Sequence, residues 1–299
     1  MRASAGWLLG GLVSLLPLLA ACSQRVPPQG AFEPGQDFEP LSAPQEADWL
    51  AMHREPGQTF EQFVQVKPNR PDESRNRIYL QPLGEFPPGA GPSFQKLREL
   101  TKAFFQMDVV VRPPLDLSGA GITSRRNPLE GQLQLRTGDL MGFLGKRLPA
   151  DAYALLGLTM EDLYPDEKWN FVFGQASTRA RVGIYSFARY DPRFYGEERA
   201  PDWQKTALLR SCKVLAHEIS HMFGIGHCTF YHCLINGSNS LEETDQHPLE
   251  LCPIDLRKLH HSIGFDVIER YEQLRDFSER EGFEEEAAWF RRRIEHLGG

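Results

Sequence analysis

The chain has 299 residues, a hydrophobic share of 41% and a formal net charge of −7. That length and apolar share are enough for one substantial hydrophobic core. An acidic chain without basic clusters gives no support for nucleic acid, or for an anionic membrane surface, as a partner.

The N-terminus has the pattern of a signal peptide. Residues 1–21 carry one charge, at Arg2, ahead of an apolar run that is too short to span a bilayer comfortably. The run ends in LAAC at residues 19–22, which resembles the lipobox of bacterial lipoproteins. We therefore expect a membrane anchor through a lipidated Cys22, with an ordinary secretory signal as the alternative. By the same resemblance, Ser23 favours the periplasmic face of the outer membrane.

The next segment is rich in proline and glycine. Residues 26–47 contain five prolines and two glycines, a composition that is poor at building a core. The sequence therefore predicts a tether over 22–47, a catalytic domain over 48–265, and C-terminal helices over 266–299.

Helical and strand patterns interleave along the predicted domain, which favours an α/β fold with a mixed twisted sheet. Apolar residues at helical spacing predict two helices, Phe94–Met107 and Thr137–Arg147. Short apolar runs bounded by turn residues predict five strands, Arg77–Leu83, Asp108–Arg112, Ala152–Leu158, Trp169–Gly174 and Val182–Tyr190.

The most informative stretch reads HEISHMFGIGH and fits the zinc-binding signature H-E-x-x-H-x-x-G-x-x-H. His217 and His221 are four residues apart, so on one helix they share a face and can hold one ion. Gly224 allows the chain to turn, and His227 returns as the third ligand. Three protein ligands leave a fourth zinc position open, which is the catalytic arrangement. Glu218 is placed to activate a water molecule held by the metal.

The sequence after this motif resembles the archaemetzincins, a branch of the metzincin metallopeptidases. Cys228, Cys233 and Cys252 match the first three of four cysteines in the family pattern. Two positions depart from it. Asp255 replaces the fourth cysteine, and Ile235 replaces the methionine that lines the floor beneath the zinc. Isoleucine is apolar and of similar bulk, so that floor should survive.

In the family the four cysteines hold a second, structural zinc. Carboxylate oxygen also binds zinc, so a site made of Cys228, Cys233, Cys252 and Asp255 remains open to this chain. A disulfide among the cysteines, or free thiols, are the alternatives. Three histidines are further candidates for the missing ligand: His232, His260 and His261.

The last part of the chain is charged and has apolar residues at helical spacing on both sides of Gly282. This pattern predicts a helical hairpin packed on the domain.

The predicted function is that of a zinc-dependent peptidase. The resemblance implies peptide or protein substrates, with an aminopeptidase preference as one possibility, and a metzincin-like sheet above the active-site helix. In that fold an edge strand pairs with the substrate, and VGIYSFARY at 182–190 is either that strand or an ordinary core strand. The alternative function is a zinc-containing envelope lipoprotein that acts as a non-catalytic binding module, which Glu218 argues against.

Overall fold

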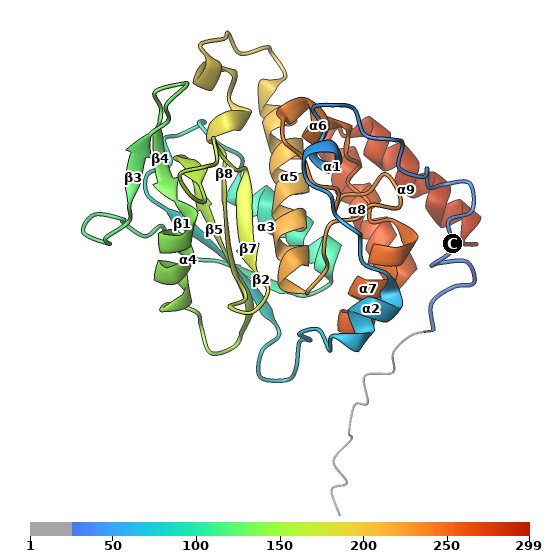
Figure 1. Ribbon diagram of the computed structural model, residues 1–299. Helices are drawn as coiled ribbons and strands as arrows, with labels where there is room; N and C mark the ends of the chain where they lie inside the picture. The colour runs from blue at the N-terminus through green and yellow to red at the C-terminus, as the bar shows by residue number, and fades with distance from the viewer. Residues whose placement is uncertain (1–25) are drawn as a thin grey trace, which may run out of the picture.

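The computed structural model describes residues 26–299, so the predicted signal peptide and Cys22 lie outside the described residues. Its centre is a five-stranded sheet of order β2-β1-β5-β8-β7 (Figure 1). Four strands are parallel, and only β7 runs antiparallel to its neighbour β8. The strands are β1 (Arg77–Leu83), β2 (Asp108–Val111), β5 (Ala152–Thr159), β7 (Gly174–Ser177) and β8 (Val182–Ser186).

The mixed sheet confirms the predicted fold class. Both faces of the sheet are covered, and the side chains of β5 alternate between the two cores that cover them. Ala154, Leu156 and Leu158 join the main core with two helices, α3 (Phe94–Phe105) and α5 (Trp203–Met222). Leu155 points the other way, into a smaller core under α4 (Thr137–Gly145). This strand is apolar at nearly every position because both of its faces are buried.

A second, three-stranded sheet was not predicted. It consists of β3 (Ser124–Arg126), β4 (Leu133–Arg136) and β6 (Asp162–Tyr164) in the order β3-β4-β6. Each of its strands is only three or four residues long and carries charged or polar side chains. Such short segments have too few residues to show a hydrophobic alternation.

Two of the strand predictions need correction. The segment 182–190 does not provide an edge, because β8 is buried between β5 and β7. The core-strand alternative was therefore right. The edge is β7, which begins at Gly174, whereas 169–173 forms no strand. The aromatic residues before Gly174 mimic a strand pattern, but they line a cleft.

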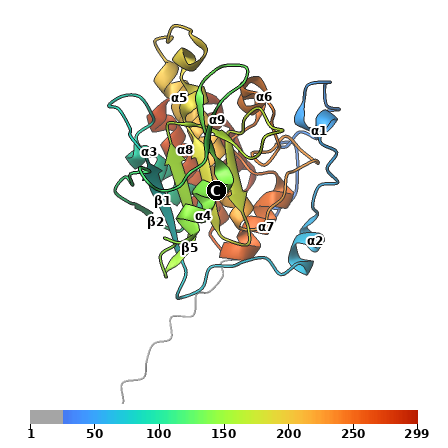
Figure 2. The same ribbon diagram turned by 60° about the vertical axis from the view of Figure 1, so that its left-hand side comes forward.

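The predicted C-terminal hairpin is confirmed by α8 (Val267–Glu281) and α9 (Glu284–His296), with Gly282 in the left-handed conformation between them. Figures 1 and 2 show these helices on the side of α5 that faces away from the sheet. Their apolar residues belong to the same core as α3 and α5. The remaining helices are α1 (Trp49–Met52), α2 (Phe60–Gln65), α6 (Leu241–Gln246) and α7 (Pro253–Ile263).

The proline-rich segment differs from the predicted tether. Over 30–38 the chain lies against α9, and Phe38 is buried there. Asp37 forms a buried ion pair with Arg293 at 2.8 Å, and its carbonyl accepts a hydrogen bond from Trp289. Composition alone missed this docking because a few specific contacts to α9 outweigh the poor core-forming tendency of the segment. No helix within 26–299 has the length and apolar character to cross a membrane.

Candidate active site

Helix α5 carries the first two histidines of the motif on one face. The Nε2 atoms of His217 and His221 lie 2.9 Å apart. Helix α5 ends at Met222, and Gly224, with a φ of +86°, turns the chain back. His227 then returns, so that one nitrogen from each of the three rings lies within 4.8 Å of the others. The structure thus brings together all three predicted ligands.

Backbone carbonyls orient the two helical histidines. Nδ1–H of His217 donates a hydrogen bond to Leu234 O at 2.9 Å. Nδ1–H of His221 donates one to Ile225 O at 2.7 Å. A carbonyl can only accept, so each Nδ1 holds the proton and each Nε2 offers a lone pair. Burial, followed by the neighbouring histidines, lowers the pKa of His221 to about 4 and that of His217 well below its usual value. Both rings are therefore neutral, which is the form that binds metal.

The third histidine is held by a carboxylate that the sequence did not reveal. Nδ1 of His227 lies 2.9 Å from Oε2 of Glu55 and 3.0 Å from Oε1. Burial raises the pKa of Glu55, but the hydrogen bond and the charge of His227 outweigh it and leave that pKa lowered. A carboxylate behind a metal-binding histidine fixes the ring and makes its other nitrogen more basic. Glu55 follows α1 in an irregular segment, where no motif marks it.

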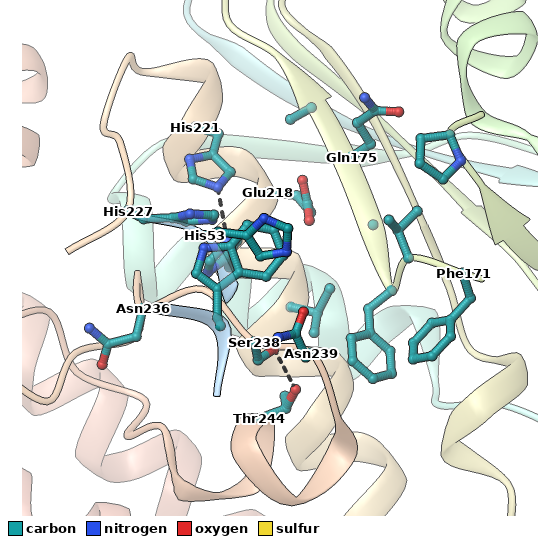
Figure 3. A pocket seen from close by; sticks show the side chains of 18 of the residues that line it. His53, Phe171, Gln175, Glu218, His221, His227, Asn236, Ser238, Asn239 and Thr244 are labelled. Atoms are coloured by element: carbon teal, nitrogen blue, oxygen red, sulfur yellow. Dashed lines mark hydrogen bonds between the residues drawn. The ribbon is translucent and has the colours of Figure 1, made fainter. Parts of the chain in front are cut away.

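Glu218 lies beside the three histidines (Figure 3). Its side chain is buried, and Oε2 has no hydrogen-bond partner among the described residues. Burial raises the pKa of Glu218 to about 8. Gly174 on the edge strand makes room for it, because a Cβ there would lie 2.5 Å from Oε1 of Glu218. This carboxylate therefore has an oxygen available for a reacting molecule.

These groups line a cleft of about 790 Å³. One wall is the edge strand β7, and Gln175 of this strand lies across from the histidines in Figure 3. Aromatic rings form another part of the wall. His53 stacks on Trp169 with 5.4 Å between the ring centroids, and Trp49 packs edge-on against His227 with 5.2 Å between the centroids. The site is thus open to a ligand on one side and enclosed on the other.

The cysteines after the motif converge on a second point. The Sγ atoms of Cys228 and Cys252 lie 3.6 Å apart, and Oδ2 of Asp255 lies 3.3 Å from the Sγ atoms of both Cys233 and Cys252. The four candidate ligand atoms are mutually within 4.8 Å, and all four residues are buried. Three sulfurs and one carboxylate oxygen at this spacing fit a tetrahedral zinc site.

Asp255 takes the place predicted for the fourth ligand, and a lysine positions it. Nζ of Lys258 donates to Oδ1 of Asp255 at 2.8 Å, with both side chains buried. That contact leaves Oδ2 directed at the sulfurs. Burial is the main cause that raises the pKa of Asp255 to about 6.

Two of the other interpretations of this region are not seen among the described residues, whereas free thiols remain the alternative to a metal site. Cys212, Cys228, Cys233 and Cys252 are all free, so no disulfide forms among them. The three histidines considered as substitute ligands are not members of the cluster: His232, His260 and His261.

The two clusters share one turn of the chain. His227 belongs to the first and Cys228 to the second. The backbone of Cys228 donates to Ile235 O at 2.9 Å, and Ile235 is fully buried where the resemblance expects an apolar floor. Ile235 is thus a buried apolar residue beside the shared turn, and its place beneath the metal stays a prediction.

A helix carrying HExxH, a third histidine after a glycine turn, a glutamate with a free oxygen and an edge strand across the cleft define a metallopeptidase of the metzincin type. The comparisons are specific about the branch. Residues 150–261 match the model of peptidase family M54. Archaemetzincin-2 from Macaca fascicularis is 40% identical over 88% of this chain and 81% of its own length. The chain belongs to the archaemetzincin family.

A second relative agrees with this assignment. Archaemetzincin-2 from Rattus norvegicus is 38% identical over 96% of this chain and 87% of its own length. The crystal structure of archaemetzincin from Methanopyrus kandleri is 27% identical, covers 65% of this chain and 99% of its own, and superposes with a TM-score of 0.49.

Proposed function

We propose that this zinc metallopeptidase hydrolyses peptide bonds at the site of His217, His221 and His227, with Glu218 as the acid–base group. The observation that carries the proposal is the convergence of three imidazole nitrogens next to a buried carboxylate with an unpartnered oxygen. A zinc ion bound there would polarise the scissile carbonyl and lower the pKa of a water molecule.

Glu218 moves the proton in this scheme. Its carboxylate takes a proton from the attacking water, whose oxygen bonds to the carbonyl carbon. The same group then gives that proton to the leaving nitrogen as the C–N bond breaks. The non-catalytic alternative gives no reason for a buried, unpartnered glutamate beside the ligands, or for a glycine on β7 that makes room for it.

We propose that the substrate backbone binds along the edge strand β7. This strand pairs with β8 on one side only, and its residues Gly174, Gln175 and Ala176 line the cleft. An extended peptide can complete the free edge with main-chain hydrogen bonds, which bind it without regard to its side chains. The aminopeptidase preference stays a prediction.

Cleavage profiling of zinc-loaded protein against a Glu218→Ala control tests the proposal. Peptide libraries should be cut by the native protein and not by the variant, while both contain equal zinc at the histidine site. Equal cleavage by both proteins would exclude Glu218, and no cleavage of any peptide by the fully loaded native protein would refute the peptidase proposal.

We further propose that Cys228, Cys233, Cys252 and Asp255 hold a second zinc. Lys258 supports this, because its contact with Oδ1 leaves only Oδ2 of Asp255 to face the sulfurs. Thiol counting on denatured, metal-free protein under non-reducing conditions is the test. Four free thiols besides Cys22, together with two zinc ions per folded chain, are expected. Two thiols would establish a disulfide and exclude this site.

The anchor is also a proposal. The LAAC sequence at 19–22 supports lipidation of Cys22, and the expected location is the periplasmic face of the outer membrane. Full-length protein should partition into membranes, and Cys22→Ala should abolish that partitioning. A cleaved, unmodified N-terminus on a wholly soluble native protein would contradict the anchor.

A further inference from the structure

A buried lysine lies one helical turn before the first metal ligand. Lys213 and His217 are four residues apart on α5, so they share a face of the helix about 6 Å apart along its axis. Lys213 lines the same cleft as His217 and Glu218, and it is only 5% exposed. A cation has thus been taken out of bulk water and placed in the wall of the catalytic cleft.

Lys213 lacks the partner that such a burial usually requires. Nζ donates to the backbone carbonyl of Asp245 at 3.1 Å, and no carboxylate of the described residues pairs with it within 4.0 Å. The side chain of Asp245 is engaged elsewhere, with Arg210 at 2.6 and 2.8 Å. The contrast is Lys258, the other buried lysine, which has its carboxylate at 2.8 Å.

The charge of Lys213 reaches other groups of the cleft. Burial, and next the positive charge of Lys213, lower the pKa of His247, which also lines the cleft. Burial lowers the pKa of Lys213 itself, and the charges of four carboxylates oppose that shift, those of Glu286, Asp245, Glu250 and Glu285. A buried ammonium with an incomplete set of partners is stabilised by an anion that enters the cleft.

Neutral polar side chains surround this end of the cleft. Ser238, Asn239 and Thr244 line it and lie on one side of the catalytic groups in Figure 3. These side chains carry no charge and so do not repel a carboxylate. Their own donors are bonded within the protein, Thr244 to Ser240 O, Ser238 to Thr244 and Asn239 to Ala47 O, so Lys213 supplies the charged donor of this region. Along an extended peptide, 6 Å corresponds to about two residues, so the anion belongs close to the bond that is cut.

We infer that Lys213 forms a carboxylate-binding subsite, which makes this enzyme prefer peptides with a carboxylate next to the scissile bond. This inference rests on the proposed peptidase function. The carboxylate comes either from an Asp or Glu side chain that flanks the bond or from a free C-terminus just beyond it. The chemistry is the same in both cases, and the test separates the two sources.

The test uses matched peptides that differ only by Glu or Gln at each position flanking the bond, each made with a free or an amidated C-terminus. Zinc-loaded native protein should prefer one carboxylate-bearing member by roughly 10- to 100-fold in kcat/KM, the usual worth of a charged hydrogen bond. In Lys213→Met that preference should fall to within about threefold.

Lys205→Met is the matched control, because it removes the same charge from an exposed position on the same helix. It should leave the preference unchanged. A preference that survives in Lys213→Met, or the lack of any preference in the native protein, would overturn the inference. In that event Lys213 only ties α5 to α6, and Lys213→Met would alter thermal stability alone.

A binding measurement separates this inference from the proposed function. Zinc-loaded Glu218→Gln protein, titrated calorimetrically with the same Glu and Gln peptides, reports the subsite without any turnover. If the Glu peptide binds more tightly than the Gln peptide, and this difference is lost when Lys213→Met is combined with Glu218→Gln, the subsite is supported even if catalysis fails. Equal binding of both peptides refutes the subsite even if peptides are cleaved.

Discussion

The two ligand clusters lie next to each other in the chain and differ in everything that decides their chemistry. The histidine cluster lines a cleft, its three rings are only partly buried, and a carboxylate beside them has a free oxygen. The cysteine cluster is fully buried, offers four ligand atoms, and holds its carboxylate with a lysine. Three ligands with an open side suit catalysis, and four closed ligands suit structure.

The turn that carries His227 and Cys228 links the positions of the two clusters. His227 and Cys228 are neighbours, so any bond that fixes the thiol also limits where the imidazole can lie. A ligand on an irregular segment needs such support, because only His217 and His221 are positioned by helix geometry. A metal bound by the second cluster would thus help to hold the third ligand of the first in place.

The largest expected effect comes from breaking the open cluster. His221→Ala should lose the zinc at the histidine site and lower turnover by roughly 10⁴-fold or more, because the metal's contribution and the water that Glu218 acts on are both lost. The fold should persist, since its core is large. Metal analysis and circular dichroism check this, and an unchanged zinc content would contradict the ligand assignment.

Breaking the closed cluster should act on stability. Asp255→Ala removes a ligand and leaves Lys258 buried without its carboxylate, a change that costs about 3–5 kcal/mol of unfolding free energy. Asp255→Cys keeps a fourth ligand and should retain the metal. Denaturant unfolding of both variants is the measurement. Equal stability of Asp255→Ala and native protein would show that the cluster is not a structural element.

Glu55 should have a smaller, purely supporting effect. Glu55→Gln keeps the shape of the side chain but weakens its contact with Nδ1 of His227, so zinc affinity or activity should fall about 10- to 100-fold. Competition with a chelator measures the affinity. Glu61→Gln, at an exposed position on α2, is the control. An effect of equal size in both variants would remove the special role of Glu55.

The smallest effect is expected at Ile235. Ile235→Met restores the residue of the family pattern at a buried apolar position, and volume-conserving swaps of this kind usually cost less than about 1.5 kcal/mol. Activity should stay within a few-fold of the native level. A large change in zinc affinity would mean that this floor does more than fill space.

Local geometry explains why so much of the site could be predicted from the sequence. A spacing of four on a helix, and a glycine that allows a turn, place His217, His221 and His227 within a single short segment. Asp255 was predictable from the resemblance, because it stands three residues after Cys252, where the family pattern has its fourth cysteine. Runs of apolar residues also predicted the buried strands Arg77–Leu83 and Ala152–Leu158.

The rest depends on contacts between distant parts of the chain. Glu55 contacts His227, which lies 172 residues later in the chain, and no spacing rule connects them. The edge strand β7 reads GQAS, which has no hydrophobic alternation, and its importance comes from its place beside α5. The segment 26–47 looked like a tether because its contacts, such as Asp37 with Arg293, are few and specific.

Graded removal of metal tests the central claim, that the open cluster is catalytic and the closed one structural. Protein holding two zinc ions per chain would be exposed to increasing chelator while zinc content, peptide cleavage and stability are followed together. We predict that one zinc leaves first and takes all cleavage with it, while stability falls only when the second leaves. Loss of both ions in one step, or cleavage that persists after the first is gone, would contradict this account.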